Sequence, residues 1–313
     1  MRNEWLSIPL EDLGMLRVQG PDATRFLQGQ LSSDIGRLSA ERSVLAGYHN
    51  PQGRTIAILR LVWLGAEDFL ALLPRELAPS VAAHLSKFVL RAKVKIADHS
   101  ADWRAAGLVG PDSAEDAQPR AIVQTSGGTL ASNVNGQTAR GSSVLVRVAG
   151  TPSRWLIVSP TDSPVNESPD APHVVPGDRE TWRLFDIASG QPQIYAATSE
   201  EFVAQMLNLD LLDAISFDKG CYTGQEVIAR AHYRGRVKRR LQRFLTATRA
   251  ELVPGSAGTL KDGRTFKVIE AALHADGRCE FLAVAPTAIE APGPGDGAAI
   301  DAQQLVLPYP LPE

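Results

Sequence analysis

The chain has 313 residues, of which 44% are hydrophobic and 21% are charged, and its net charge is -3. The length suggests about two domains, and the composition excludes a disordered chain and a generally basic nucleic-acid coat. Its two cysteines cannot form a disulfide framework, it has no signal-peptide pattern, and no apolar run approaches about 18 residues, so we expect a cytoplasmic protein that does not enter a membrane.

In the first third of the chain, predicted strands alternate with two predicted helices. Residues 20–22 (GPD) suit a helix start, and apolar residues from 23 to 31 follow at helical spacing. Two β-rich runs at 43–48 and 55–64 flank the turn residues 50–53 (NPQG), which indicates a hairpin. Further strands are predicted at 15–19, 69–73, 93–96 and 103–110, and a second helix at 76–90.

The rest of the chain contains a proline-rich break and ends in β-structure. Strands are predicted at 142–148 and 154–158, and five prolines between residues 159 and 178 then indicate a surface loop or linker. Helices are predicted at 179–188 and 200–213. After residue 238, short strand candidates separated by Gly, Pro and Asp predict a small all-β C-terminal unit; they span 241–247, 266–272 and 280–285.

The densest cluster of reactive and conformationally special residues is 218–226 (DKGCYTGQE). Its two glycines allow positive φ angles. Lys219 and the N-terminus of a helix predicted to begin near residue 223 or 224 could both stabilise a thiolate at Cys221. Residue type alone favours an inert packing role for a lone cysteine, and its neighbours leave both roles open. No metal site is predicted, because Cys221 and Cys279 lack Cys or His partners at ligand spacing.

A basic stretch follows this cluster. Residues 227–250 contain eight Lys and Arg and no Asp or Glu, whereas the rest of the chain carries 24 basic and 35 acidic residues. Glu226 and Arg230 are spaced to pair along a helix. The other charges admit three interpretations: a solvated face, nucleic-acid contact, or a site for a small polyanionic ligand. Acidic charge elsewhere disfavours a large nucleic-acid footprint and leaves a local anion pocket open.

Residues 219–226 (KGCYTGQE) resemble the signature of the YgfZ folate-binding proteins, which are relatives of the glycine-cleavage aminomethyltransferase and of mitochondrial assembly factors for iron-sulfur proteins. The resemblance extends to residues 20–30, 91–96, 202–210 and 234–239, and so covers nearly the whole chain.

The resemblance implies an α+β fold of three parts. The parts are a ferredoxin-like α+β unit at 1–110, a second α+β unit at 111–237 that carries the signature and can interleave with the first, and a C-terminal β-barrel at 238–313. In the family, these parts surround a central hole that holds the folate.

The resemblance also implies a site for tetrahydrofolate or a derivative. Trp182 would stack on the pterin or benzoyl ring, although residue type alone favours a core or interface role for it. Cys221 would be the reactive group, with Lys219 tuning it. The other implied binding residues are Tyr222, Gly224, Gln225, Glu226, Arg230 and Arg236.

The chain departs from the family pattern at four places, one of which is Ala204, where the family commonly has a Pro. Leu13 stands where the family has a second folate-associated Trp, and the strand at 54–59 lacks the Asp that aminomethyl-transferring relatives require. Ala188 lies where those relatives carry a carboxylate for the pterin, and Asp186 is the nearest acid. Because pterin donors need a paired acceptor, its loss should weaken or reorient folate binding.

The favoured hypothesis is a folate-binding protein that supports the synthesis or repair of iron-sulfur clusters in client enzymes, including those that thiolate tRNA, rather than a conventional enzyme. A folate-dependent one-carbon transferase is the first alternative, and the missing carboxylate in strand 54–59 argues against it. A tRNA-binding or protein-interaction module that uses the basic residues 230–243 is the second, with direct tRNA contact not favoured.

Overall fold

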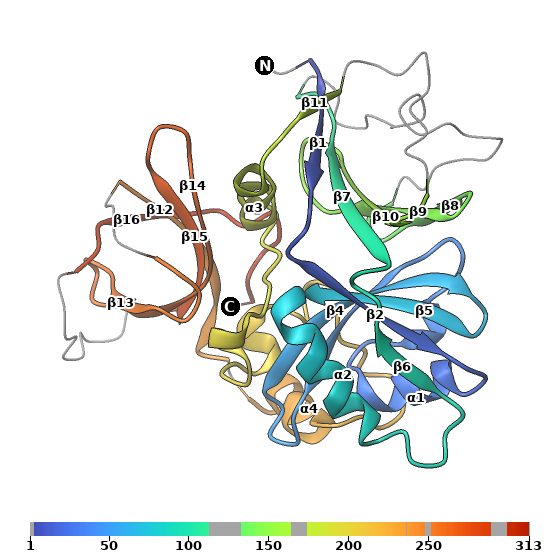
Figure 1. Ribbon diagram of the computed structural model, residues 1–313. Helices are drawn as coiled ribbons and strands as arrows, with labels where there is room; N and C mark the ends of the chain where they lie inside the picture. Colours follow the sequence, from blue (N-terminus) through green and yellow to red (C-terminus); the bar gives the residue numbers. More distant parts are fainter. Residues whose placement is uncertain are drawn as a thin grey trace.

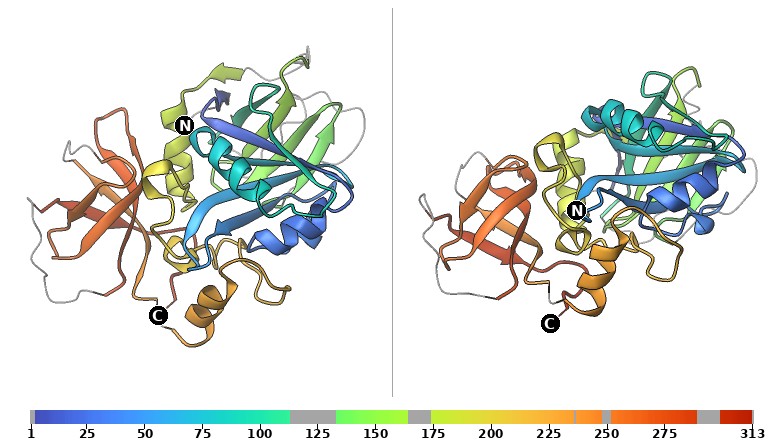
Figure 2. Two further views of the ribbon diagram at one scale, coloured as in Figure 1. Left: turned by 60° about the horizontal axis from the view of Figure 1, so that its bottom comes forward. Right: turned by 90° about the horizontal axis from the view of Figure 1, so that it is seen from below.

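The computed structural model describes residues 3–112, 133–163, 174–235, 237–247, 252–288 and 299–312. It contains three β-sheets and few helices, and α3 (Arg179–Ala188) lies between the C-terminal sheet and the other two (Figures 1 and 2). No helix of the described residues is long and apolar enough to cross a membrane.

The first sheet is antiparallel and has the strand order β3-β4-β5-β2-β6. The hairpin predicted across residues 50–53 is confirmed as β3 and β4. The predicted helix after Asp22 is confirmed as α1, and the second predicted helix is shorter than expected. The elements are β2 (Leu13–Gln19), α1 (Ala23–Gln30), η1 (Ile35–Arg37), β3 (Val44–His49), β4 (Thr55–Gly65), β5 (Asp68–Pro74), η2 (Arg75–Leu77), α2 (Ala78–Ser86) and β6 (Lys95–Asp98).

The second sheet has the order β11-β1-β7-β10-β9-β8 and draws strands from both sides of residue 110. Its strand β1 pairs in parallel with β11 and antiparallel with β7. Residues on both sides of the boundary predicted at 110 therefore contribute to one sheet. The strands are β1 (Trp5–Pro9), β7 (Trp103–Val109), β8 (Gln137–Arg140), β9 (Ser143–Val148), β10 (Arg154–Pro160) and β11 (Val174–Pro176).

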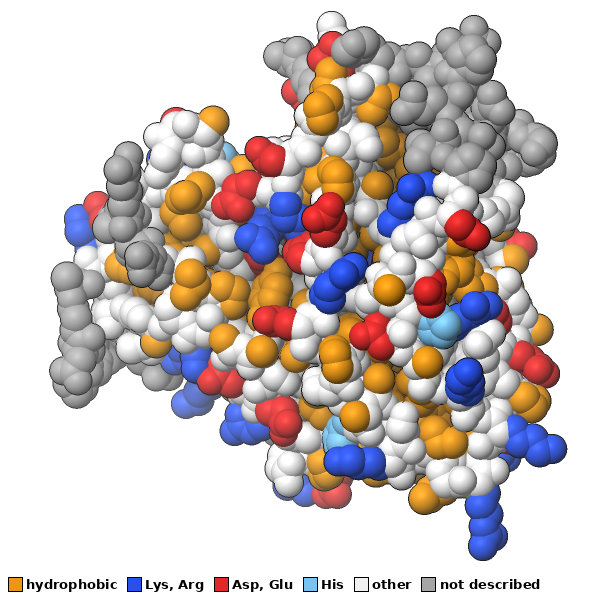
Figure 3. Space-filling model, in the orientation of Figure 1, with side chains coloured by type: hydrophobic (Ala, Val, Ile, Leu, Met, Phe, Trp, Pro, Cys, Tyr) orange, Lys and Arg blue, Asp and Glu red, His pale blue; other side chains and the backbone are white. Residues whose placement is uncertain are grey.

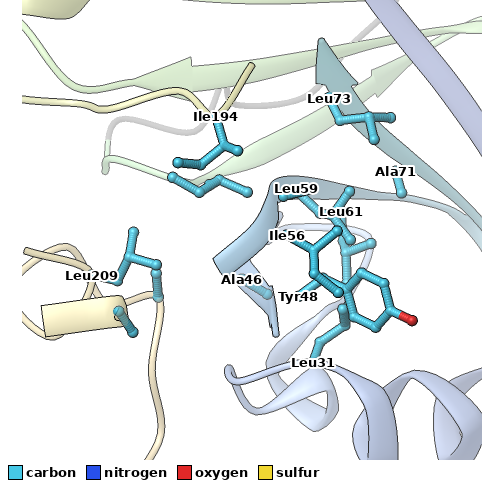
Figure 4. Close-up of a cluster of buried hydrophobic side chains, with 14 of the residues drawn as sticks. Leu31, Ala46, Tyr48, Ile56, Leu59, Leu61, Ala71, Leu73, Ile194 and Leu209 are labelled. Carbon is cyan, nitrogen blue, oxygen red and sulfur yellow. The ribbon is translucent and has the colours of Figure 1, made fainter. Parts of the chain in front are cut away.

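The first sheet is covered on both faces, and β5 shows how. Side chains of a strand alternate between the two faces of its sheet. Phe69, Ala71 and Leu73 belong to the core shared with α1 and α2, part of which Figure 4 shows. Leu70 and Leu72 belong to a separate core shared with the second sheet. A strand buried on both faces explains the nearly continuous apolar run that the sequence shows here.

The C-terminal sheet has the order β13-β14-β15-β12-β16 around a core that includes Phe244, Phe266 and Phe281. The closed barrel implied by the resemblance is not found among the described residues. The edge strands β13 and β16 are short, and an isolated parallel bridge between Leu260 and Ile300 lies next to them. The strands are β12 (Arg239–Thr246), β13 (Ala257–Thr259), β14 (Thr265–Leu273), β15 (Cys279–Pro286) and β16 (Ala302–Leu305).

The helix predicted at residues 200–213 is wrong. This segment begins with a turn, in which Glu200 has a φ of 63°, and Thr55 donates its backbone N–H to Phe202 and accepts one from Glu200. Beyond η5 (Ala204–Leu207), Asn208 has a φ of 57° and its buried side chain donates to the carbonyl of Leu241 at 3.0 Å. Hydrogen bonds to distant parts of the chain thus override the helical spacing of the apolar residues. The remaining helices are η4 (Ala196–Thr198) and α4 (Gln225–Tyr233).

Candidate functional site

The loop that carries the signature, residues 219–226, is held at both sides of its cysteine. Before Cys221, the ammonium of Lys219 donates to the carbonyl oxygens of Leu31 at 2.6 Å and Ser33 at 2.7 Å. The ammonium also lies 5.1 Å from the centre of the Tyr222 ring, and burial lowers the pKa of Lys219 to about 8. The ammonium thus contacts the loop after α1 and the ring of Tyr222, which gives Lys219 an anchoring role that the sequence does not predict.

Cys221 is exposed, whereas the next side chain, Tyr222, is buried. Cysteine is among the residue types most often found buried, so an exposed one between two anchored neighbours is unusual. Cys279 differs, because it lies buried in β15 and burial raises the pKa of its thiol. The two thiols are therefore not equivalent, and only that of Cys221 is accessible to a partner.

Gly224 joins the signature to the hairpin turn between β3 and β4. It has a φ of 82° and precedes α4 directly, so the predicted helix start is confirmed. A Cβ at this position would lie 2.6 Å from the carbonyl oxygen of Asn50 and 3.0 Å from the Cα of Gly53. The turn and the start of α4 are thus in backbone contact, which only glycine at residue 224 permits.

Replacing Gly224 by alanine should lower the free energy of unfolding by about 2–4 kcal/mol, because the change combines a left-handed backbone with overpacking against the turn. Denaturant unfolding measures this loss. Gly220→Ala is the matched control, since no atom lies within 4 Å of a Cβ at that position. Equal losses in the two variants would contradict the close contact at Gly224.

The predicted binding residues on α4 face outward. Glu226 and Arg230 form the predicted i, i+4 pair at 3.1 Å, with side-chain exposures of 86% and 71%. Pairs this exposed contribute little to stability. Gln225 is half-buried at the start of α4. Arg236 lies outside the described residues.

Several arginines of the basic stretch form ion pairs or hydrogen bonds with other parts of the fold. Arg240 is buried against Asp210, and Arg243 pairs with Glu280 at 2.6 Å. Arg239 donates to the hydroxyl and the carbonyl oxygen of Thr265. Acidic and basic side chains are also interspersed over the face shown in Figure 3. Much of the basic charge predicted to attract an anion therefore supports the packing of the C-terminal sheet.

A cavity of about 90 Å³ lies where the three sheets and α3 meet. We call it the central cavity. None of residues 219–226 lines it, so the structure divides the predicted site between the signature loop and this cavity. Its walls are formed by Leu10, Leu13, Leu45, Ile58, Arg60, Leu72, Val148, Leu156, Arg179, Trp182, Asp186, Gln191, Pro192, Gln193 and Glu270.

Trp182 lies in the wall of the central cavity and is also part of the core. It is 5% exposed, and a Cβ added at Gly107 would overlap the indole ring. The guanidinium carbon of Arg154 lies 4.7 Å from the ring centre. One side of the indole is thus occupied by the second sheet, while the residue still borders the cavity. Leu13, on the opposite strand β2, adds an apolar but not an aromatic wall.

Two carboxylates reach the cavity, and the sequence identified only one of them. Asp186, two residues before Ala188 in α3, accepts a hydrogen bond from Arg154 at 2.8 Å. Glu270 comes from β14, and burial raises its pKa to about 7. The signal that could have identified Glu270 is a single acid within an otherwise largely apolar strand (TFKVIEAAL). Because Glu270 is far from Trp182 along the chain, the sequence did not indicate that both residues line one cavity.

Arginines complete the polar part of the cavity. Arg60 is buried and donates to the side-chain oxygen of Asn135 at 2.7 Å. Arg179 donates through Nε to Asp12 at 2.7 Å, whereas its buried Nη1 has no hydrogen-bond partner among the described residues. Apolar walls with a few convergent polar groups suit a small organic ligand that has both donors and acceptors. A pterin ring is such a ligand, so these residues fit a folate.

One face of the β3–β4 hairpin connects the two parts of the site. Leu45 pairs with Arg60 and Gly47 with Ile58, so these four residues share the cavity face. A Cβ at Gly47 would meet the ring of His49, and this ring lies 6.4 Å from the ring of Tyr222. The signature therefore lies at the end of the strands that line the cavity. Along β3, His49 beside the signature is about 13 Å from Leu45 in the cavity wall.

Comparisons with known proteins were made by sequence and by structure. No model of a protein family matches the chain. The chain is 35% identical over 280 residues to the tRNA-modifying protein YgfZ of Serratia proteamaculans, covering 86% of this chain and 81% of that protein. It is 33% identical over 255 residues to the protein of the same name from Yersinia pseudotuberculosis, covering 81% and 74%. An uncharacterized protein of Haemophilus influenzae is 32% identical, covering 86% and 85%.

Among solved structures, the aminomethyltransferase T of the glycine cleavage system from Bartonella henselae has a similar fold. The TM-score is 0.69, the sequence identity is 16%, and the match covers 91% of this chain and 79% of that one. This likeness confirms that the fold resembles that of the aminomethyltransferase, as the family resemblance implied.

Proposed function

Because the chain belongs to the family of the tRNA-modifying protein YgfZ, we propose that it is a cytoplasmic folate-binding protein that supports iron-sulfur clusters in client enzymes, including tRNA-modifying ones. Its ligand is tetrahydrofolate or a derivative. Its clients are iron-sulfur proteins or their assembly factors, and direct binding of tRNA is not required.

The central cavity is the observation that carries this proposal. It combines the indole of Trp182 with apolar walls, two carboxylates and Arg60 and Arg179, at the meeting point of three sheets in an aminomethyltransferase-like fold. The apolar walls suit a flat heterocycle, a carboxylate suits its amino and imino donors, and the arginines suit its carbonyl oxygen. The cavity thus contains the groups that a pterin ring needs.

The signature loop supplies the second part of the proposed function. Cys221 is the reactive group, and it is accessible to a client protein because Lys219 and Tyr222 hold the loop from both sides. The β3–β4 hairpin lines the cavity and also contacts the signature loop at Gly224. Folate binding and the conformation of the loop can therefore influence each other. A one-carbon transferase is less well supported, because β4 (TIAILRLVWLG) carries no carboxylate for proton transfer.

Titration of tetrahydrofolate against intrinsic tryptophan fluorescence tests the proposal. We expect saturable quenching in the wild type, and loss of most of that signal in Trp182→Phe, because no other tryptophan of the described residues lines the cavity. Trp155→Phe is the matched control, since Trp155 is fully buried in the second sheet away from the cavity. Absence of saturable quenching in the wild type would rule out folate binding.

A further inference from the structure

Glu270 is a buried carboxylate that protein groups satisfy only in part. It is 4% exposed and lies in the middle of β14. Its Oε2 accepts a hydrogen bond from the Tyr195 hydroxyl at 2.7 Å. Its Oε1 lies 3.6 Å from Nε of Arg183, which is too long for a good hydrogen bond. Burying an acid in this way is costly unless something else binds it.

Two hydrogen-bond donors beside Glu270 also lack an acceptor among the described residues. Nη1 of Arg179 and Nε of Arg183 are both buried, and neither has a hydrogen-bond partner among the described residues. Arg179 is at the same time held in place by its bond to Asp12. Of these groups, Arg179 and Glu270 line the central cavity. They offer a ligand a donor and an acceptor that do not satisfy one another, which suits a ligand edge that presents both kinds of group.

The other carboxylate of the cavity, that of Asp186, already forms an ion pair. Asp186 binds Arg154, whose side chain is fully buried and also donates to Ala149 and Ser189. Releasing Asp186 would leave a buried guanidinium without its counter-charge, which is strongly unfavourable. The cation nearest to Glu270, Arg183, lies 3.6 Å away and is 33% exposed, so it does not depend on Glu270 in the same way. Each oxygen of Glu270 keeps a lone pair for a further donor.

We propose that Glu270 binds the 2-amino and N3 donors of the pterin ring, with Arg179 facing the neighbouring carbonyl oxygen. This inference rests on the proposed folate binding. A carboxylate pairs with two adjacent N–H donors as it does with a guanidinium fork. Burial places the pKa of Glu270 near 7, so the cost of ionising it when the ligand arrives is small. Because β14 belongs to the C-terminal sheet, the ligand would join this sheet to α3 and the first sheet.

The test compares two ligands and three proteins by equilibrium binding. The ligands are tetrahydrofolate and its analogue that lacks the 2-amino group. The proteins are the wild type, Glu270→Gln and the control Glu280→Gln, whose buried carboxylate lies in β15 and pairs with Arg243 and His274 away from the cavity. Cooperative unfolding of all three proteins shows that they are folded.

We expect the wild type and Glu280→Gln to bind tetrahydrofolate at least about tenfold more tightly than the analogue, as one charge-assisted hydrogen bond requires. Glu270→Gln should bind tetrahydrofolate about tenfold more weakly and discriminate much less between the ligands, because the Gln amide faces the pterin donors with a donor of its own. Undiminished discrimination by Glu270→Gln would overturn the role of Glu270 and leave folate binding intact. No binding by the wild type would overturn both proposals.

Discussion

Replacing Arg240 by alanine should lower the free energy of unfolding by about 3–5 kcal/mol, a loss that can be measured by denaturant unfolding. Arg240 is buried at the start of β12, and its two terminal nitrogens pair with the two carboxylate oxygens of Asp210 at 3.0 and 2.9 Å. It also donates to the carbonyl oxygen of Gln205 at 3.0 Å. Without the guanidinium, the carboxylate of Asp210 stays buried with no counter-charge, and this accounts for most of the loss.

Two controls isolate the cause of this loss. Arg230→Ala removes an arginine of the same basic stretch whose pair with Glu226 is exposed, and it should cost less than about 1 kcal/mol. The double variant Arg240→Met with Asp210→Leu removes both buried charges and should recover most of the stability. If Arg240→Ala were no more destabilising than Arg230→Ala, the buried ion pair would not support the fold as described.

Sequence patterns predicted the elements that depend on local signals. The turn residues 50–53 between two β-rich runs correctly marked the β3–β4 hairpin. The GPD start and the helical spacing after it correctly marked α1, and the helix predicted at 179–188 is confirmed as α3. The structure adds that Asp178 accepts a hydrogen bond from the backbone N–H of Thr181 at the start of α3. In each case the information lies within about a dozen residues, which is where periodicity and turn chemistry act.

The sequence could not predict features that depend on distant partners. The strand β1 pairs with β11 across more than half of the chain, and no local signal encodes that pairing. The apolar spacing at 200–213 indicated a helix because the bonds of Thr55 and Leu241 to this segment were not visible. The central cavity also depends on distant parts of the chain. The family resemblance pointed to Trp182 in α3, whereas no local signal placed Glu270, from the C-terminal sheet, beside it.

Replacing Cys221 by alanine should abolish the biological activity and leave stability nearly unchanged. The thiol is exposed, so its removal should change the free energy of unfolding by less than about 0.5 kcal/mol. The anchors of the loop, Lys219 and Tyr222, remain in place. A thiolate is both a nucleophile and a metal ligand, and alanine can replace neither role. Loss of activity in a stable protein would therefore assign the function to the thiol itself.

The most direct measurement is complementation of a bacterial strain that lacks its own YgfZ family protein, with the activity of an iron-sulfur enzyme as the readout. Wild type, Cys221→Ala and Cys279→Ala are compared at equal protein levels, with Cys279 as the control because its thiol is buried. We expect the wild type and Cys279→Ala to restore the enzyme activity and Cys221→Ala to leave it at the level of the empty vector. Equal restoration by Cys221→Ala would contradict the role assigned to the signature loop.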